Sequence, residues 1–345
     1  MKSAFPASVP TARTRHCALT MKRISAVLLL AASLVFPAGL ARASAAVKYV
    51  THNIPAGQYP MSLAVDPGTH NVYVANEQSN TVTVINGSSI IATIPVGQYP
   101  VGVAVDPTTH TVYVANLTTA NDPTTNGSIS IINGTSVTAT VSVESGPTGV
   151  AVDPTTHTIY VTNTSSNTVS VINGTAVTAT IGVGYHPVGV AVDPGSHTVY
   201  VTNAYTEGYT SVINGNIVSA TIPADDPYGV AVDPTTHTVY VTNLSDNGLP
   251  YSNSVSVING NTITSSIPMN YPMPWAVAVD PTTHSAFVTV SGTSSGNFIE
   301  VISGTGITAD VPAGNYPVAV AVDPTPHKVY VANVYDATLT EFRGR

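Results

Sequence analysis

The stretch "AVDPTTHTIYVTN", from Ala151 to Asn163, returns almost unchanged as "AVDPTTHTVYVTN" from Ala231 to Asn243. Its first four letters, AVDP, occur seven times in the chain, beginning at Ala64, Ala104, Ala151, Ala191, Ala231, Ala278 and Ala321. The Asp residues of successive copies lie 40, 47, 40, 40, 47 and 43 positions apart. A recurring period of this length indicates a fold built from copies of one structural unit.

Each repeat predicts four short strands. In the third repeat the strands read TGVAVD, TIYVTN, TVSVI and VTATIGV, rich in Val, Ile and Thr and bounded by Pro, Gly and Asn. An Asn-Gly pair, suited to a tight hairpin, follows the third strand at Asn86, Asn133, Asn173, Asn214 and Asn259, with Ser303-Gly304 as the variant. No segment after residue 46 has helical periodicity. Four strands in about 40 residues predict the blade of a β-propeller.

The two ends of the repeat region complement each other. The seventh repeat supplies only three strands and stops at LTEFRGR, whereas residues 47–60, VKYVTHNIPAGQYP, match a fourth strand in register. We therefore predict an all-β, seven-bladed β-propeller with four-stranded antiparallel blades. In this fold the N-terminal strand completes the last blade and closes the ring. A linear solenoid would instead need a cap at each end.

The first 45 residues differ from the rest of the chain. They contain six basic residues and no acidic one, and from Met21 they run through an apolar stretch to Ala43-Ser44-Ala45. This pattern is typical of a secretory signal peptide, with Met21 as an alternative start, and the apolar stretch is too short to span a membrane. We expect residues 1–45 to be a cleaved leader and residues 46–345 to form a single propeller. Cleavage would remove Cys17, the only cysteine.

Net charge limits the partners of the processed chain. Residues 46–345 contain four basic and eighteen acidic residues, a net charge of −14. A nucleic-acid-binding face needs many Lys and Arg side chains for phosphates, so we expect no nucleic-acid partner. Binding to anionic lipid is disfavoured for the same reason, and we expect no membrane insertion after cleavage.

The second strand of each repeat carries a family motif. YVTN at Tyr160, Tyr200 and Tyr240, and YVAN at Tyr73, Tyr113 and Tyr330, resemble the repeat of the bacterial and archaeal YVTN-family β-propellers. The resemblance covers residues 46–345 and fails once, in the sixth repeat, where FVTV replaces the motif. It implies a seven-bladed propeller in an exported or cell-surface protein, but it implies no single activity.

The Asp-Pro-x-x-His turn repeats in all seven copies. A catalytic or metal site needs one copy, or a few that converge, so sevenfold repetition favours a structural turn. We expect each Asp to accept hydrogen bonds from N–H groups of its turn, and each His to bond back to its own hairpin. We expect the Asn of YVTN to hold the loop that follows it. No catalytic residue, metal site or cofactor is predicted.

Functional residues are expected where the repeat changes. The loops between second and third strands vary in length, at 116–127, 243–254 and 290–297, and they share a face with the links between blades. After the first Pro of each blade, five repeats have small or aliphatic residues, but the fifth has Tyr228 and the sixth has Trp275, the only Trp. The predicted ligand-binding set is Trp275, Tyr228, Asp225, Asp226, Tyr185 and His186. Aromatic rings beside carboxylates suit sugars, peptides or cationic groups. The alternative is that Trp275 only fills the channel.

These features favour an exported, non-enzymatic propeller that binds a surface protein, peptide or glycan through its variable face. One alternative is a hydrolase or lactonase at the channel mouth, and another is a passive component of the cell envelope. A metal-dependent lactonase would need acidic ligands in the channel, whereas the inner strands carry no acid before the repeated Asp. Periplasmic, cell-surface and extracellular locations all fit the leader.

Overall fold

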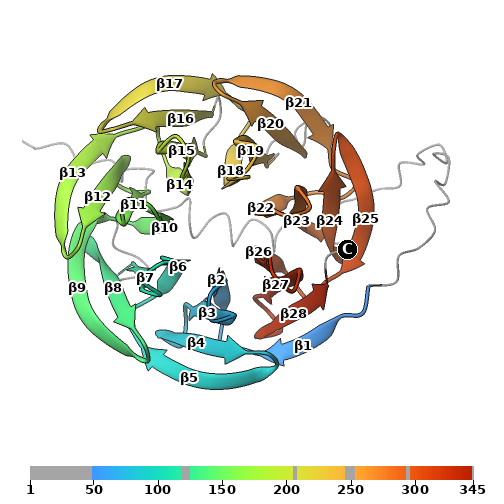
Figure 1. The fold of residues 1–345 in the computed structure, drawn as a ribbon, viewed down its shortest axis with the longest axis horizontal. Coiled ribbons are helices and arrows are strands. Elements are labelled where there is room, and N and C mark those ends of the chain that lie inside the picture. The colour runs from blue at the N-terminus through green and yellow to red at the C-terminus, as the bar shows by residue number, and fades with distance from the viewer. Residues whose placement is uncertain (1–48, 118–124, 205–207, 245–252, 293–295, 344–345) are drawn as a thin grey trace, which may run out of the picture.

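A computed structural model describes residues 49–117, 125–204, 208–244, 253–292 and 296–343. Seven four-stranded antiparallel sheets form a closed ring (Figure 1). Blade one consists of β2 (Pro60–Asp66), β3 (Asn71–Asn76), β4 (Thr81–Asn86) and β5 (Ser89–Pro95). Blade two consists of β6 (Pro100–Val105), β7 (Val112–Asn116), β8 (Asn126–Asn133) and β9 (Ser136–Ser145). Blade three consists of β10 (Pro147–Asp153), β11 (Thr158–Asn163), β12 (Thr168–Asn173) and β13 (Ala176–Gly182).

The remaining blades repeat this order from the centre outward. Blade four consists of β14 (Pro187–Asp193), β15 (Thr198–Asn203), β16 (Tyr209–Asn214) and β17 (Ile217–Pro223). Blade five consists of β18 (Pro227–Val232), β19 (Thr238–Asn243), β20 (Ser254–Asn259) and β21 (Thr262–Pro268). Blade six consists of β22 (Pro274–Asp280), β23 (Ser285–Gly292), β24 (Gly296–Ser303) and β25 (Gly306–Pro312). Blade seven consists of β26 (Pro317–Asp323), β27 (Lys328–Asn333), β28 (Thr338–Arg343) and β1 (His52–Pro55).

The predicted ring closure is confirmed. Strand β1 pairs antiparallel with β28, with His52 opposite Glu341 and Pro55 opposite Thr338, so the first strand lies beside the last in Figure 1. Ile54 of β1 is 1% exposed and packs into the cluster shared by blades seven and one. The two ends of the chain therefore hold the ring together through a full ladder and an apolar contact.

The hydrophobic core lies between neighbouring blades. One cluster joins Tyr73 and Val82 of blade one to Val103 and Val114 of blade two, and similar clusters follow around the ring. The second strand of each blade is buried along almost its whole length because a neighbouring sheet covers each side. The burial of each such Val or Ile contributes roughly 1.5–3 kcal/mol.

The innermost strands are crowded, as their small residues predict. A Cβ added to Gly229 in β18 would lie 2.6 Å from the backbone oxygen of Trp275 in β22. Only glycine allows these two backbones to approach so closely. The expected leader lies outside the described residues, as does much of the three variable loops. Within the described part of the chain, no helix has the length and apolar character to cross a membrane.

Candidate functional site

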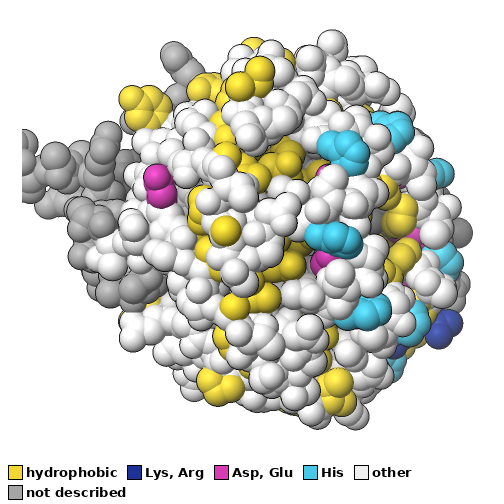
Figure 2. Space-filling model, turned by 60° about the vertical axis from the view of Figure 1, so that its left-hand side comes forward, with side chains coloured by type: hydrophobic (Ala, Val, Ile, Leu, Met, Phe, Trp, Pro, Cys, Tyr) yellow, Lys and Arg dark blue, Asp and Glu magenta, His cyan; other side chains and the backbone are white. Residues whose placement is uncertain are grey.

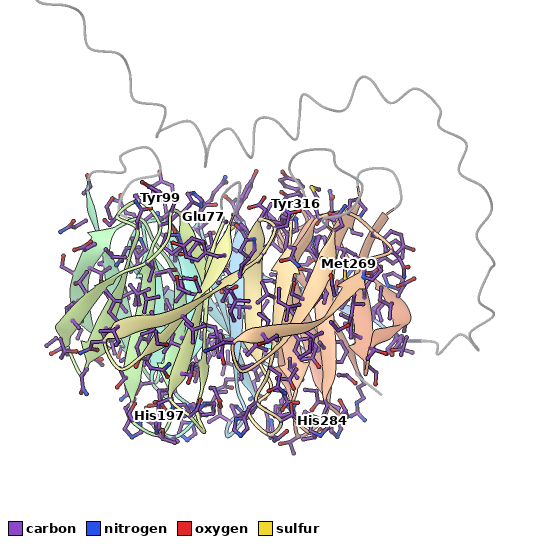
Figure 3. The ribbon with its side chains drawn as sticks, turned by 90° about the horizontal axis from the view of Figure 1, so that it is seen from above. Glu77, Tyr99, His197, Met269, His284 and Tyr316 are labelled. Atoms are coloured by element: carbon purple, nitrogen blue, oxygen red, sulfur yellow. The ribbon has the colours of Figure 1, made fainter. Side chains whose placement is uncertain are left out.

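The ring has two distinct faces. Figure 3 shows His197 and His284 at one end of the blades and Tyr99, Tyr316 and Met269 at the other. The first end carries the Asp-Pro-x-x-His turns, and we call it the turn face. The second carries the links that join one blade to the next, and we call it the link face.

On the turn face, each repeated Asp holds its own turn. Asp153 accepts hydrogen bonds from the backbone N–H of Thr155 at 3.0 Å and from its hydroxyl at 2.6 Å. The backbone N–H of His157 donates to the backbone oxygen of Asp153 at 2.8 Å. His157 has a positive φ of 56°, and the other six repeated His residues are also in this left-handed region. The expected contact of the Asp with its turn is thus present in the structure.

The His side chains do something that the sequence did not predict. Each reaches the Asp of the preceding blade instead of its own hairpin: His197 Nδ1 lies 2.7 Å from Asp153 and His157 Nδ1 lies 2.7 Å from Asp106. The full set of pairs is His70–Asp323, His110–Asp66, His157–Asp106, His197–Asp153, His237–Asp193, His284–Asp233 and His327–Asp280. His side chains follow one another in an arc on this side of the molecule (Figure 2). Every blade interface therefore has one Asp–His pair.

These pairs affect the ionisation of the carboxylates. Burial acts to raise the pKa of Asp153, but hydrogen bonds from Thr155 and His197 outweigh it, so this pKa lies below its usual range. The pKa is lowered in the same way at Asp106, Asp193, Asp233 and Asp280. These five Asp side chains thus stay charged at neutral pH, and each can accept a hydrogen bond from the Nδ1–H group of the His in the next blade. We infer that the seven Asp–His pairs hold neighbouring blades together.

On the link face, two residues of the predicted set are in contact. The rings of Tyr228 and Trp275 are 5.0 Å apart and nearly perpendicular, at 82°. Trp275 is 9% exposed, and its indole Nε1 has no hydrogen-bond partner among the described residues. An indole N–H usually finds an acceptor when it is buried, so this unpaired donor is an exception among buried polar groups.

The Tyr228–Trp275 contact continues across the face. Trp275 lies 6.0 Å from Tyr316, Tyr316 lies 4.9 Å from Tyr335, and Tyr335 lies 6.0 Å from Tyr59. We call these five residues the aromatic row. It crosses blades five, six, seven and one, and burial raises the pKa of Tyr316 to about 12. Tyr335 was absent from the predicted set, although it is an aromatic residue in a loop between the second and third strands, the class of connection in which functional residues were expected.

The other predicted residues lie on neighbouring links. Asp225 is exposed and Asp226 is partly exposed, with a positive φ of 50° that ends the link before Pro227. Tyr185 is 65% exposed on the link of blade four. His186 follows it, and its backbone N–H donates to Asn167 at 3.0 Å. The structure thus brings Trp275 and Tyr228 together, while a ligand-binding role for all six residues stays a prediction.

Among the described residues, no group of three or more His, Cys, Asp or Glu side chains is arranged to hold a metal ion. The seven His residues belong to separate interfaces and do not converge. Their Nδ1 atoms are already used by the Asp–His pairs.

Comparison with known proteins shows the fold alone. No family model matches the sequence, and no curated protein matches it either. The chain is structurally similar to a Kuenenia stuttgartiensis hydrazine synthase chain, with a TM-score of 0.71, 19% identity and coverage of 89% of this chain and 99% of the other. It is also similar to virginiamycin B lyase from Staphylococcus aureus, with a TM-score of 0.71, 12% identity and coverage of 86% and 100%. The WD40 propeller domain of Doa1 matches with a TM-score of 0.68, 10% identity and coverage of 85% and 96%.

Proposed function

We propose that this chain is an exported propeller of the YVTN type that binds a protein, peptide or glycan through its link face and catalyses no reaction. The leader pattern supports export to the periplasm, the cell surface or the medium. The YVTN and YVAN motifs support the family. The low content of basic residues argues against a nucleic-acid partner.

The aromatic row is the observation that carries this proposal. Tyr and Trp side chains combine a large contact area with few rotatable bonds, and they dominate binding energy in known interfaces. Tyr335 is 54% exposed at one end of the row, and the buried indole N–H of Trp275 lacks an acceptor within the described chain. Asp225 and Asp226, on the link that precedes Tyr228, add carboxylate acceptors. The row thus offers apolar surface together with polar groups.

The turn face offers no comparable surface. Its seven Asp side chains are buried and its seven His side chains are each paired across a blade interface. The Asp carboxylates and the His Nδ1 atoms that repeat on this face are therefore committed to holding blades together. The exposed aromatic side chains of Tyr185 and Tyr335 lie on the link face instead.

The test is a binding screen with a matched pair of variants. The full chain would be probed on a glycan array and a peptide array, and each hit would be checked by Trp275 fluorescence. Tyr335→Ala should weaken the affinity for a hit about tenfold or more, which corresponds to 1.4 kcal/mol or more. Ile91→Ala is the control, because Ile91 is also 54% exposed but lies on the outer strand β5.

The outcomes separate the functional alternatives. Hits that quench Trp275 and weaken in Tyr335→Ala but not in Ile91→Ala support binding at the aromatic row. Hits that respond equally to both variants would place the ligand elsewhere. Absence of any hit on both arrays would favour the passive envelope component.

A further inference from the structure

Six of the seven blades share a buried polar network beneath the link. The Asn that ends the second strand donates from Nδ2 to a Ser or Thr hydroxyl on the third strand at 2.9–3.0 Å. These pairs are Asn76–Thr83, Asn116–Ser130, Asn163–Ser170, Asn203–Ser211, Asn243–Ser256 and Asn333–Thr340. In blades one and seven the Asn oxygen also accepts the N–H of a link glycine. The network is neutral, and in these two blades it joins the link to the blade.

Blade six replaces this network as a unit. The Asn becomes Val290 and the hydroxyl residue becomes Glu300. Where four other links have a glycine packed against the Asn, blade six has Asn270. Opposite Glu300, on the outer strand β25, Asp310 occupies the position that Thr93 holds in blade one. Glu300 now accepts the link N–H itself, at 2.9 Å from the nitrogen of Asn270.

The three polar side chains of this set converge. The side-chain amide of Asn270 is within hydrogen-bonding reach of the carboxyl groups of Glu300 and Asp310, and these two acids lie opposite each other on paired strands. Glu300 has no exposed surface, whereas Asn270 and Asp310 are exposed. The cluster therefore has a buried carboxyl group at its base and opens to solvent through the other two residues.

One atom at the base lacks a partner. Glu300 Oε2 has no hydrogen bond from any residue of the described chain. The Asn Oδ1 atoms of blades two to five also lack a partner, but an amide oxygen is neutral, whereas a buried carboxylate is costly unless a proton, a cation or hydrogen-bond donors neutralise it. Burial and the neighbouring charge of Asp310 raise the pKa of Glu300 to about 8. The six sister blades show that the fold does not need an acid here.

We propose that Glu300, Asp310 and Asn270 form a binding site for a hard divalent cation, calcium. Their available ligand atoms are all oxygens: two carboxylate groups and one amide oxygen after rotation of the Asn270 side chain. Calcium accepts six to eight oxygen ligands in irregular geometry, including water, whereas magnesium demands a near-octahedral set. The exposed side of the cluster leaves room for water ligands. The proposed site thus has two acidic side chains and one amide, and water would supply the remaining ligands.

Binding would place the positive charge of the cation beside the buried carboxyl group of Glu300. The cation would also join link residue Asn270 to strands β24 and β25, much as the Asn joins the link to the blade in blades one and seven. Calcium should therefore stabilise blade six in particular.

The test uses the full chain with calcium chloride as the probe. Isothermal titration measures binding and its stoichiometry. We expect one calcium ion per chain and a melting temperature that rises with calcium concentration. Magnesium chloride at the same concentration should give a much smaller shift.

Three variants assign the response to the site. Glu300→Gln keeps the shape of the side chain and should abolish calcium binding. A combined variant restores the network of the sister blades through Asn270→Gly, Val290→Asn, Glu300→Ser and Asp310→Thr. It should fold and should not bind calcium. Glu77→Gln is the control, because Glu77 is an acid on the link face of blade one.

Each result decides the proposal. A calcium response in the unaltered chain and in Glu77→Gln, lost in the other two variants, supports it. No response in the unaltered chain overturns it. A response that survives Glu300→Gln, or that Glu77→Gln removes equally, also overturns it because general acidity of the surface would then be the cause.

Discussion

The turn face and the link face are made by the same seven repeats, yet they differ in regularity. On the turn face every blade contributes the same Asp and the same His, and each pair spans one blade interface. On the link face the connections differ in length and composition, and the aromatic row crosses only four of the seven blades. The uniform turn face connects the blades. On the irregular link face, residues can differ in one blade without breaking a contact that all blades share, so a specific site is expected there. Four predictions test this division.

The largest effect is expected from opening the ring. Deletion of residues 49–55 removes β1, the packing of Ile54 and the edge contact of Tyr49 with Phe342. The cavity left by Ile54 alone should cost roughly 2–5 kcal/mol, and the exposed edge of β28 should promote association. Thermal melting and sedimentation velocity would measure both. A monomeric variant with an unchanged melting temperature would show that the turn-face pairs hold the ring without closure.

Truncation of the Trp at the centre of the aromatic row should have the next largest effect. Trp275→Ala empties a space between Tyr228 and Tyr316 and should destabilise the chain by roughly 3–5 kcal/mol. Val101→Ala, at the corresponding position of blade two, should cost much less because Val101 is smaller and partly exposed. Equal decreases in melting temperature for the two variants would mean that the aromatic row packs no more tightly than an ordinary link.

The Asp–His pairs should give smaller but uniform effects. His197→Gln removes one pair and should cost roughly 1–2 kcal/mol. A double-mutant cycle with Asp153→Asn isolates the coupling between the two side chains. The same cycle on His237 and Asp193 should give the same coupling within error, because the turn face repeats. Couplings that differ several-fold between interfaces would contradict the uniformity of this face.

Acid should act on the turn face through the same carboxylates. The pKa of Asp153 and of four equivalent Asp residues is lower in the folded chain than in the unfolded chain. Their stabilisation is present above the unfolded pKa of about 4 and is lost as pH falls through the folded value. Denaturant melts between pH 6 and 2 should show this loss, and Asp153→Asn should flatten it slightly. A stability that is constant down to pH 2 would refute the argument.

Most of the fold could be predicted from the sequence because its repeat is explicit. The seven AVDP copies predicted seven blades. The missing fourth strand of the last repeat predicted where the ring closes, and the β1–β28 ladder confirms it. The partner of each His could not be predicted in the same way. The Asp four residues before it and the Asp of the preceding blade are equivalent in the sequence, so only the geometry of the turn selects between them.

The candidate site was harder to predict for a related reason. Trp275 and Tyr228 stood out because they break the repeat, and they do touch. Tyr335 was missed because it lies in a second-to-third-strand loop far from the links in sequence. Glu300 was missed because it replaces a Ser or Thr at the same place where Val290 replaces the Asn and Asn270 replaces a glycine. That these three positions belong together appears only once the strands are paired.

The direction of the Asp–His pairs bears on how such a chain could change its number of blades. Each blade gives its Asp to the His of the next blade, and His70 meets Asp323 where the last blade returns to the first. A tandem duplication of one whole repeat would bring one carboxylate and one imidazole, and each would meet a partner from an adjacent copy. Gain or loss of a complete repeat therefore leaves no unmatched group on the turn face. A duplicated segment that carries the Asp without the His, or the His without the Asp, would leave one, so the pairing favours evolution by whole blades.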